Sequence, residues 1–137
     1  MTDKISNMLS TNFYMARSGS LLDVTTGTYN IIRIPQFAFV DEIWVKVITP
    51  YSGGTGASSS MTVGFLGNKE TADPDAFIDS VANVETAGLY AMTDDAAVAS
   101  NGKWFDSGSG MLTITVDDGD HTALLDAIVF MRYCIIN

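Results

Sequence analysis

Residues 126–136, DAIVFMRYCII, constrain the fold of this chain more than any other segment. The run is rich in β-branched and aromatic residues, and apolar side chains occupy both sets of alternating positions. At about 3.3 Å per residue, such a run can cross a small domain as one strand. Because both of its faces are largely apolar, we expect this segment to be a central strand in the core of a β-sandwich.

Shorter strand-like runs, bounded by Gly, Asp, Asn, Ser and Thr, recur through the rest of the chain, and no window shows a helical apolar stripe. We expect strands at 28–34, 40–48, 60–65, 88–91, 102–105 and 111–116. Residues 76–81 fit either one helical turn or a short strand. The predicted fold is all-β, an antiparallel β-sandwich of jelly-roll type with about eight strands, and a closed barrel is the alternative.

Two local arrangements follow from the same pattern. The Gly- and Ser-rich residues 50–60 separate two strand-like runs, and we expect those runs to pair as a hairpin. In the run 111–116, alternation places Leu112 and Ile114 in the core and Thr113 in solvent.

The first residues differ from the rest of the chain. Polar residues interrupt two apolar patches, one of which contains Phe13, Tyr14 and Met15. We interpret residues 1–27 as an extended N-terminal arm and residues 28–137 as the β-sandwich domain. The arm could add a strand to its own sheet or to the sheet of a neighbouring subunit.

Composition narrows the classes of partner. The chain has 137 residues, of which 47% are hydrophobic, and a formal net charge of −9. A surplus of apolar residues indicates surface shared with other proteins, whereas the negative charge opposes binding to nucleic acid. No run approaches the about 18 apolar residues of a membrane-spanning helix, and no signal peptide is visible, so we expect no membrane association.

Catalytic and metal-binding patterns are weak. His121 and Cys134 are the sole histidine and cysteine, which rules out a Cys/His zinc site within one subunit. His121 lies in no hydrolase motif, and we expect it to be a polar residue at the entry to the last strand. Asp117, Asp118 and Asp120 could ligate calcium, but a turn explains them better. We expect no enzymatic activity and no cofactor.

Five aromatic residues raise the question of a sugar-binding platform: Tyr51, Tyr90, Phe105, Trp104 and Trp44. Core or interface packing is the simpler explanation for most of them. Trp44 is the exception, because Glu42 and Lys46 share its face of the strand. A tryptophan on a charged face is typical of a partner contact.

Several segments together resemble a family of small β-rich virion proteins of tailed phages, of the head decoration or cement type. They are IPQFAFV at 34–40, IWVKVITPY at 43–51 with the Gly-rich loop after it, MTVG at 61–64, GLY at 88–90, GKWF at 102–105 and MRY at 131–133. The resemblance covers about three quarters of the chain and rests on structural residues.

This resemblance implies a capsid decoration protein, commonly a homotrimer, that bridges and stabilises major capsid proteins on the head surface. We therefore expect a virion location on the capsid surface, after assembly in the host cytoplasm, and partner contacts through Phe13, Tyr14, Met15 and Trp44. A tail- or fibre-associated sandwich that binds host glycans is the alternative. A small lyase or hydrolase using His121 or the Asp cluster is a third hypothesis.

Overall fold

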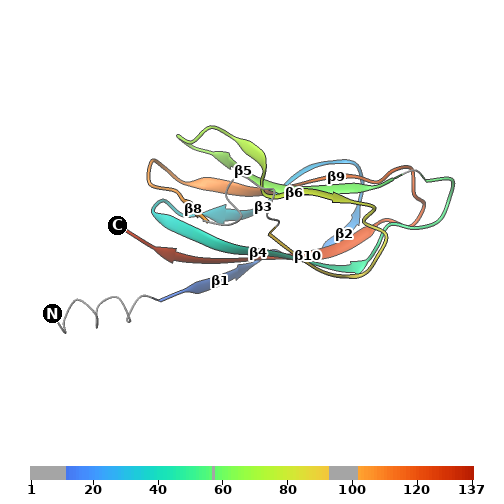
Figure 1. Ribbon diagram of the computed structural model, residues 1–137, viewed down its shortest axis with the longest axis horizontal. Helices are drawn as coiled ribbons and strands as arrows, with labels where there is room; N and C mark the ends of the chain where they lie inside the picture. The colour runs from blue at the N-terminus through green and yellow to red at the C-terminus, as the bar shows by residue number, and fades with distance from the viewer. Residues whose placement is uncertain (1–11, 57, 93–101) are drawn as a thin grey trace.

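The computed structural model describes residues 12–56, 58–92 and 102–137, and these form two antiparallel β-sheets stacked face to face (Figure 1). The described residues contain ten strands: β1 (Tyr14–Arg17), β2 (Leu21–Val24), β3 (Gly27–Ile34), β4 (Ala38–Thr49), β5 (Ser60–Gly67), β6 (Asp73–Ala82), β7 (Gly88–Ala91), β8 (Lys103–Trp104), β9 (Gly110–Asp117) and β10 (Leu125–Ile135). The antiparallel β-sandwich predicted from the sequence is confirmed.

In sheet A, β10 lies between β4 on one side and both β1 and β2 on the other, while β7 and β8 pair with the far edge of β4. Sheet B has the order β3-β9-β5-β6. The ten strands therefore occupy eight positions, because two sheet edges are each shared by two short strands. The predicted central position of the last strand is confirmed, and the jelly-roll type of the sandwich stays a prediction.

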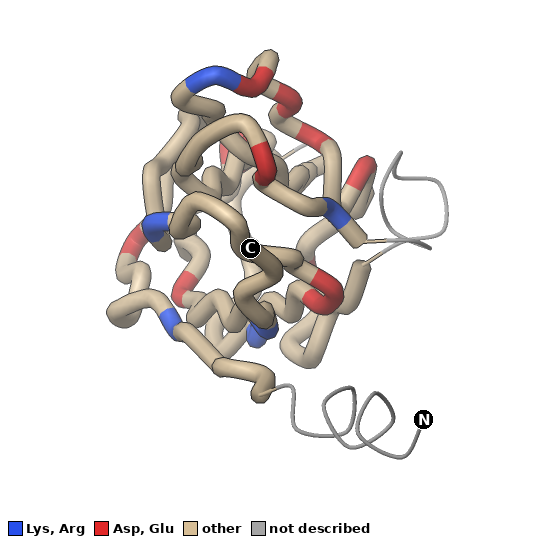
Figure 2. Tube along the Cα trace, turned by 90° about the vertical axis from the view of Figure 1, so that its left-hand side faces the viewer, with Lys and Arg blue, Asp and Glu red and all other residues tan. Residues whose placement is uncertain are grey.

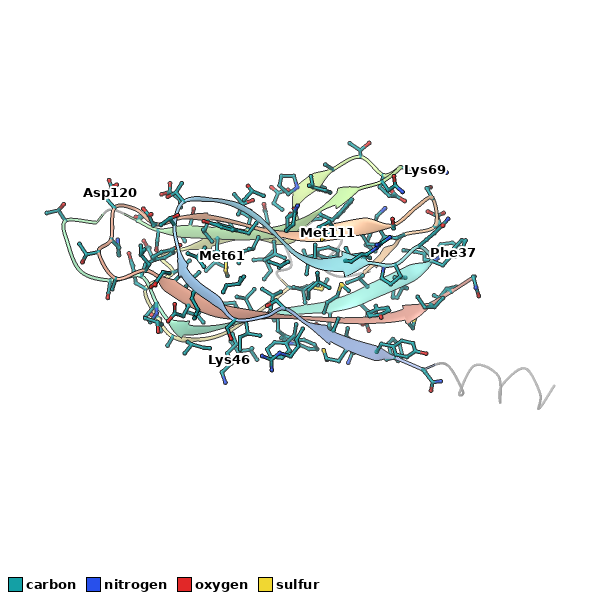
Figure 3. The ribbon with its side chains drawn as sticks, turned by 180° about the vertical axis from the view of Figure 1, so that it is seen from behind. Phe37, Lys46, Met61, Lys69, Met111 and Asp120 are labelled. Atoms are coloured by element: carbon teal, nitrogen blue, oxygen red, sulfur yellow. The ribbon has the colours of Figure 1, made fainter. Side chains whose placement is uncertain are left out.

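The core lies between the two sheets and is built by simple alternation. On β4, Ile43 and Val45 are buried, and on β10, Val129 and Met131 are buried, with polar or partly exposed residues between them. Met61 of β5 lies between the sheets (Figure 3). Each such side chain contributes about 1.5 to 3 kcal/mol when fully buried, so the inward-facing residues of both sheets hold the sandwich together.

The prediction of a hairpin between β4 and β5 was wrong, because β4 pairs within sheet A and β5 pairs with β6 and β9 of sheet B. The connector crosses from one sheet to the other, and it is longer than the usual hairpin loop of two to about five residues. Tyr51 fixes its path. The Tyr51 amide donates to the Val84 carbonyl at 3.0 Å, and its hydroxyl donates to the Val24 carbonyl at 2.7 Å.

Two further details were settled by tertiary contacts. Residues 76–81, which fitted a helical turn or a strand, belong to strand β6. Thr113, expected in solvent, is 1% exposed. Its cross-strand neighbour on β5 is Gly64, and a Cβ at Gly64 would meet the backbone of Asp73 and Pro74. The start of β6 therefore covers this side of sheet B, which alternation within β9 cannot reveal.

The described part of the N-terminal segment belongs to its own sheet. β1 pairs with residues 130–133 of β10, and β2 pairs near Leu125 and Ala127. Ser18 bridges the gap: its amide donates to the Val129 carbonyl at 2.8 Å, and its hydroxyl accepts from the Val129 amide at 2.9 Å. Residues 1–11 of the expected arm lie outside the described residues, and the boundary at residue 27 stays a prediction.

Candidate functional site

The solvent side of sheet A carries a row of cross-strand partners at its centre, and three of them have large side chains. Arg17, Phe130, Trp44 and Ala91 are direct cross-strand partners on four adjacent strands. Because the flanking residues on β4 and β10 are buried in the core, this row must point away from it. Lys46 lies two positions farther along β4 and projects outward from the sheet (Figure 3). The centre of this surface is therefore a row of aromatic and basic side chains.

Arg132 organises one end of this surface. The pairing of β4 with β10 shifts between Glu42 and Val40, so that Asp41 is an extra residue in a β-bulge. Arg132 donates from Nε to Asp41 Oδ1 at 3.0 Å and from a terminal nitrogen to Oδ2 at 2.8 Å. Hydrogen bonding to Asp41 raises the pKa of Arg132. This bidentate pair fixes the plane of the guanidinium group.

The fixed guanidinium group lies close to two aromatic rings. Its central carbon is 5.5 Å from the centre of the Phe13 ring and 5.9 Å from that of Trp44. Both distances are within the range of cation–π attraction. Arg132 therefore brings together two residues that the sequence analysis singled out from segments 31 positions apart. Sequence reasoning missed Arg132, although a lone arginine in an apolar strand was a usable signal.

All four residues predicted as partner contacts lie on sheet A or directly beside it. Phe13, Tyr14 and Met15 are 54%, 51% and 56% exposed, and Trp44 is half-buried. Met15 lies opposite Arg132 across the β1–β10 pair. The Tyr14 ring packs against Tyr133 at a centre-to-centre distance of 5.5 Å. The structure thus brings these residues to one sheet, and their role as contacts stays a prediction.

Exposed large hydrophobic side chains are distributed unevenly. Ten are exposed in the described part of the chain, and Leu66 on β5 is the one that belongs to sheet B. The other nine belong to strands of sheet A or directly adjoin them: Phe13, Tyr14, Met15, Leu22, Ile48, Leu89, Trp104, Ile135 and Ile136. Exposed apolar surface is therefore concentrated on sheet A.

Each sheet has a shallow hollow on its described surface. The larger, about 720 Å³, lies where β7 meets the end of β4 and is lined by Lys46, Val47, Ile48, Ala87, Gly88 and Leu89. The smaller, about 280 Å³, lies on sheet B beside Arg33, Leu66 and Met111. Because the larger hollow adjoins the aromatic and basic row, it extends the same surface toward the edge of sheet A.

His121, the residue on which the enzyme hypothesis depends, lies in neither hollow. Its side chain is 7% exposed, and its Nε2 is 3.0 Å from Glu85 Oε1. The ring also packs edge-on against Tyr51, and a Cβ at Gly56 would collide with it. This arrangement holds the connector between the sheets against the turn before β10, which is a structural role.

The aspartate cluster of residues 117, 118 and 120 forms part of a local turn. The Gly119 amide donates to Asp117 Oδ1, and the Asp120 amide donates to Asp118 Oδ1, both at 3.0 Å. The hydrogen bond from Asp120 and another from Thr26 lower the pKa of Asp118. These contacts are those of a turn. Among the residues that the structure describes, no group of three or more His, Cys, Asp or Glu side chains is placed to hold a metal ion.

The five aromatic residues do not form one platform. Tyr51 and Phe105 are 0% exposed and belong to the core. Trp104 is exposed at the end of β8, where its indole donates to the Ile136 carbonyl at 3.1 Å. Trp44 alone of the five belongs to the central row of sheet A.

Within the described ranges, no helix has the length and apolar character needed to cross a membrane.

Comparison with known proteins identifies the fold. No protein-family model matches the chain, and no curated protein matches it significantly. A chain in the acid-stable capsid structure of Helicobacter pylori bacteriophage KHP30 is similar, with 16% identity and a TM-score of 0.65, over 90% of this chain and 87% of that one.

Chains in two other phage capsid structures are also similar. For the capsid asymmetric unit of cyanophage Pam1, the identity is 13% and the TM-score 0.67; for the capsid of Ralstonia phage GP4, they are 14% and 0.68. Each match covers 92% of this chain and 86% of the other. At such low identities, these similarities establish a shared fold.

Proposed function

We propose that this chain is a structural protein of a tailed bacteriophage virion, a capsid decoration (cement) protein that bridges and stabilises major capsid proteins on the head surface. The observation that supports this proposal best is the fold itself, shared over about nine-tenths of the chain with components of three phage capsids. Fold similarity does not by itself assign function, and two other observations support the same conclusion.

The first is the surface of sheet A. Its exposed apolar and aromatic side chains, nine of the ten in the described chain, are typical of a surface that another protein covers. The second is that His121 and Asp118, on which the enzyme hypothesis depends, are used by local structure. His121 contacts Glu85, and Asp118 accepts a hydrogen bond within its turn. Both observations favour a binding role over an enzymatic one.

The proposed mechanism is thermodynamic. A protein that binds the assembled shell and not its separated subunits stabilises the shell by mass action. A homotrimer at a three-fold position would present three equivalent copies of the docking surface and strengthen binding through multivalency. Phe13, Tyr14, Met15 and Trp44 are the proposed contacts. The proposed location is the capsid surface, after assembly in the host cytoplasm.

Binding to empty, expanded shells from the phage that carries the gene tests this function. We expect the purified chain to co-sediment with shells that lack it, to saturate at a fixed number of copies, and to raise the temperature at which the shells fall apart. A chain that neither sediments with the shells nor stabilises them would refute the proposal. Binding to host glycans by such a chain would indicate the tail- or fibre-associated alternative.

A further inference from the structure

We infer that the two sheets have different roles in the bound protein. The solvent side of sheet A docks onto the shell, and sheet B with its acidic loops faces the medium. The partner surface would present aliphatic or aromatic side chains flanked by carboxylates. This inference rests on the proposed function and adds to it the orientation of the molecule and the chemistry of its partner.

Charge is divided between the two sheets. The strands of sheet A carry four basic and four acidic residues, so this sheet is close to neutral. The strands of sheet B carry four acidic residues and one basic residue, Arg33. The loops of the described chain carry a further five acidic residues and one basic residue, Lys69. Seen end on, acidic segments gather along the side of sheet B (Figure 2). An acidic, hydrated surface is costly to bury, whereas a neutral apolar one is not.

Two cations on sheet A have no acidic partner among the residues that the structure describes. Arg17 and Lys46 are exposed, and neither forms an ion pair within the described residues. Each stands beside apolar neighbours, since Arg17 is paired across strands with Phe130 and Lys46 with Ile128 and Leu89. Arg132, by contrast, is already held by Asp41. The free cations are therefore the groups that can recognise carboxylates on a partner.

The sheet geometry sets the spacing of those carboxylates. Arg17 and Lys46 are two strands apart and two residues apart along the strand direction. With strands about 4.8 Å apart and a rise of about 3.3 Å per residue, their Cα atoms are about 12 Å from each other. Between them lie Phe130 and Trp44. This pattern of two cations around an aromatic centre is suited to binding a protein surface rather than a small ligand.

Matched substitutions on the two sheets test the orientation. The variant Arg17→Glu/Lys46→Glu changes the charge of sheet A, and Arg33→Glu/Lys69→Glu makes the same change on the side of sheet B. A second pair, Leu89→Ser and Leu66→Ser, removes an exposed leucine from each sheet, 64% and 46% exposed respectively. Because all six positions are exposed, each variant is expected to fold, and thermal unfolding in solution checks this directly.

The readout is the affinity of each folded variant for the undecorated shells. We expect the two sheet A variants to lose at least about tenfold in affinity, since like charges placed across an interface are strongly unfavourable, and the two sheet B variants to stay within about twofold of the parent chain. Equal losses on both sheets, or a loss confined to sheet B, would overturn the orientation. A parent chain that does not bind the shells would refute the proposed function itself.

Discussion

Arg132 and Asp41 form a bidentate ion pair between neighbouring strands because a β-bulge makes Asp41 an extra residue of β4. The bulge turns the carboxylate toward the solvent side of sheet A, where both of its oxygens accept hydrogen bonds from one guanidinium group. That contact orients Arg132 between the rings of Phe13 and Trp44. A local irregularity of one strand therefore shapes the surface that we propose binds the shell.

Asp41→Asn tests the contribution of this pair. The side chains of Arg132 and Asp41 are 40% and 20% exposed, so the pair is partly screened by solvent. We expect the free energy of unfolding to fall by about 1 kcal/mol, and by less at high salt. Urea denaturation at low and high ionic strength measures both effects. Glu42→Gln removes the same charge from the adjacent position and should cost clearly less; an equal cost would mean that net charge alone matters.

Ser18→Ala tests how the N-terminal segment is attached to β10. The Ser18 hydroxyl accepts the hydrogen bond of the Val129 amide in the gap between β1 and β2. Alanine would leave that buried amide without a partner, at a cost of about 1 to 3 kcal/mol. We expect faster hydrogen exchange of the Val129 amide and lower stability toward urea. The matched change Ser20→Ala, at an exposed position, should alter neither quantity.

Gly56→Ala tests the packing of the connector against His121. A Cβ at Gly56 would overlap the imidazole ring, which Glu85 and Tyr51 hold in place. We expect a loss of about 1 to 3 kcal/mol in stability, as is usual when extra volume is forced into a packed site. Gly19→Ala should be nearly neutral, because nothing lies within 4 Å of a Cβ there.

A double substitution then identifies His121 as the group responsible. If the overlap with the ring is the cause, Gly56→Ala should cost almost nothing when introduced into His121→Ala. Additive costs in the double variant would mean that Gly56 is needed for another reason. Thermal unfolding of the parent chain, of the two single variants and of the double variant measures these costs.

The raised pKa of Tyr51 predicts a specific loss of stability in alkali. Burial, followed by the charge of Asp118, raises the pKa of Tyr51 well above its ordinary value of 10.0. The folded protein therefore keeps the phenol protonated, while the unfolded chain releases this proton above about pH 10. The stability that this group contributes is complete below that pH and falls as the pH rises further, by at most about 1.4 kcal/mol per pH unit.

Tyr51→Phe separates this effect from general alkaline unfolding. Phenylalanine does not titrate, so the variant should lose less stability between neutral pH and about pH 11 than the parent chain. At neutral pH it should be less stable by about 1 kcal/mol, because the buried Val24 carbonyl loses its hydrogen bond. Tyr14→Phe, at an exposed ring, should cost less than about 0.5 kcal/mol at neutral pH. Parallel alkaline curves for the parent and Tyr51→Phe would contradict this account.

Much of the fold could be read from alternation and turn residues alone. The two-sided apolar run became the central strand β10, and Leu112 and Ile114 are core residues as their spacing predicted. What failed depended on contacts distant in sequence. The connector after Thr49 looked like a hairpin loop, but Tyr51 is drawn into the core by hydrogen bonds to Val24 and Val84, and this carries the chain to the other sheet.

The candidate site was partly visible in the same way. Trp44 could be singled out because charged neighbours share its face, yet its association with Phe13 through Arg132 required knowledge of strand register. The bulge at Asp41 changes that register by one residue, and nothing in the local sequence marks it. The division of charge between the sheets also emerged only after each residue could be assigned to a sheet.

Cryo-electron microscopy of shells saturated with this protein tests the central claim most directly, because it shows which sheet faces the capsid. The account predicts that Trp44, Lys46 and Arg17 lie against the shell, with apolar side chains and carboxylates of the major capsid protein opposite them, while sheet B faces solvent. A map in which sheet B contacts the shell and the solvent side of sheet A is uncovered would contradict it.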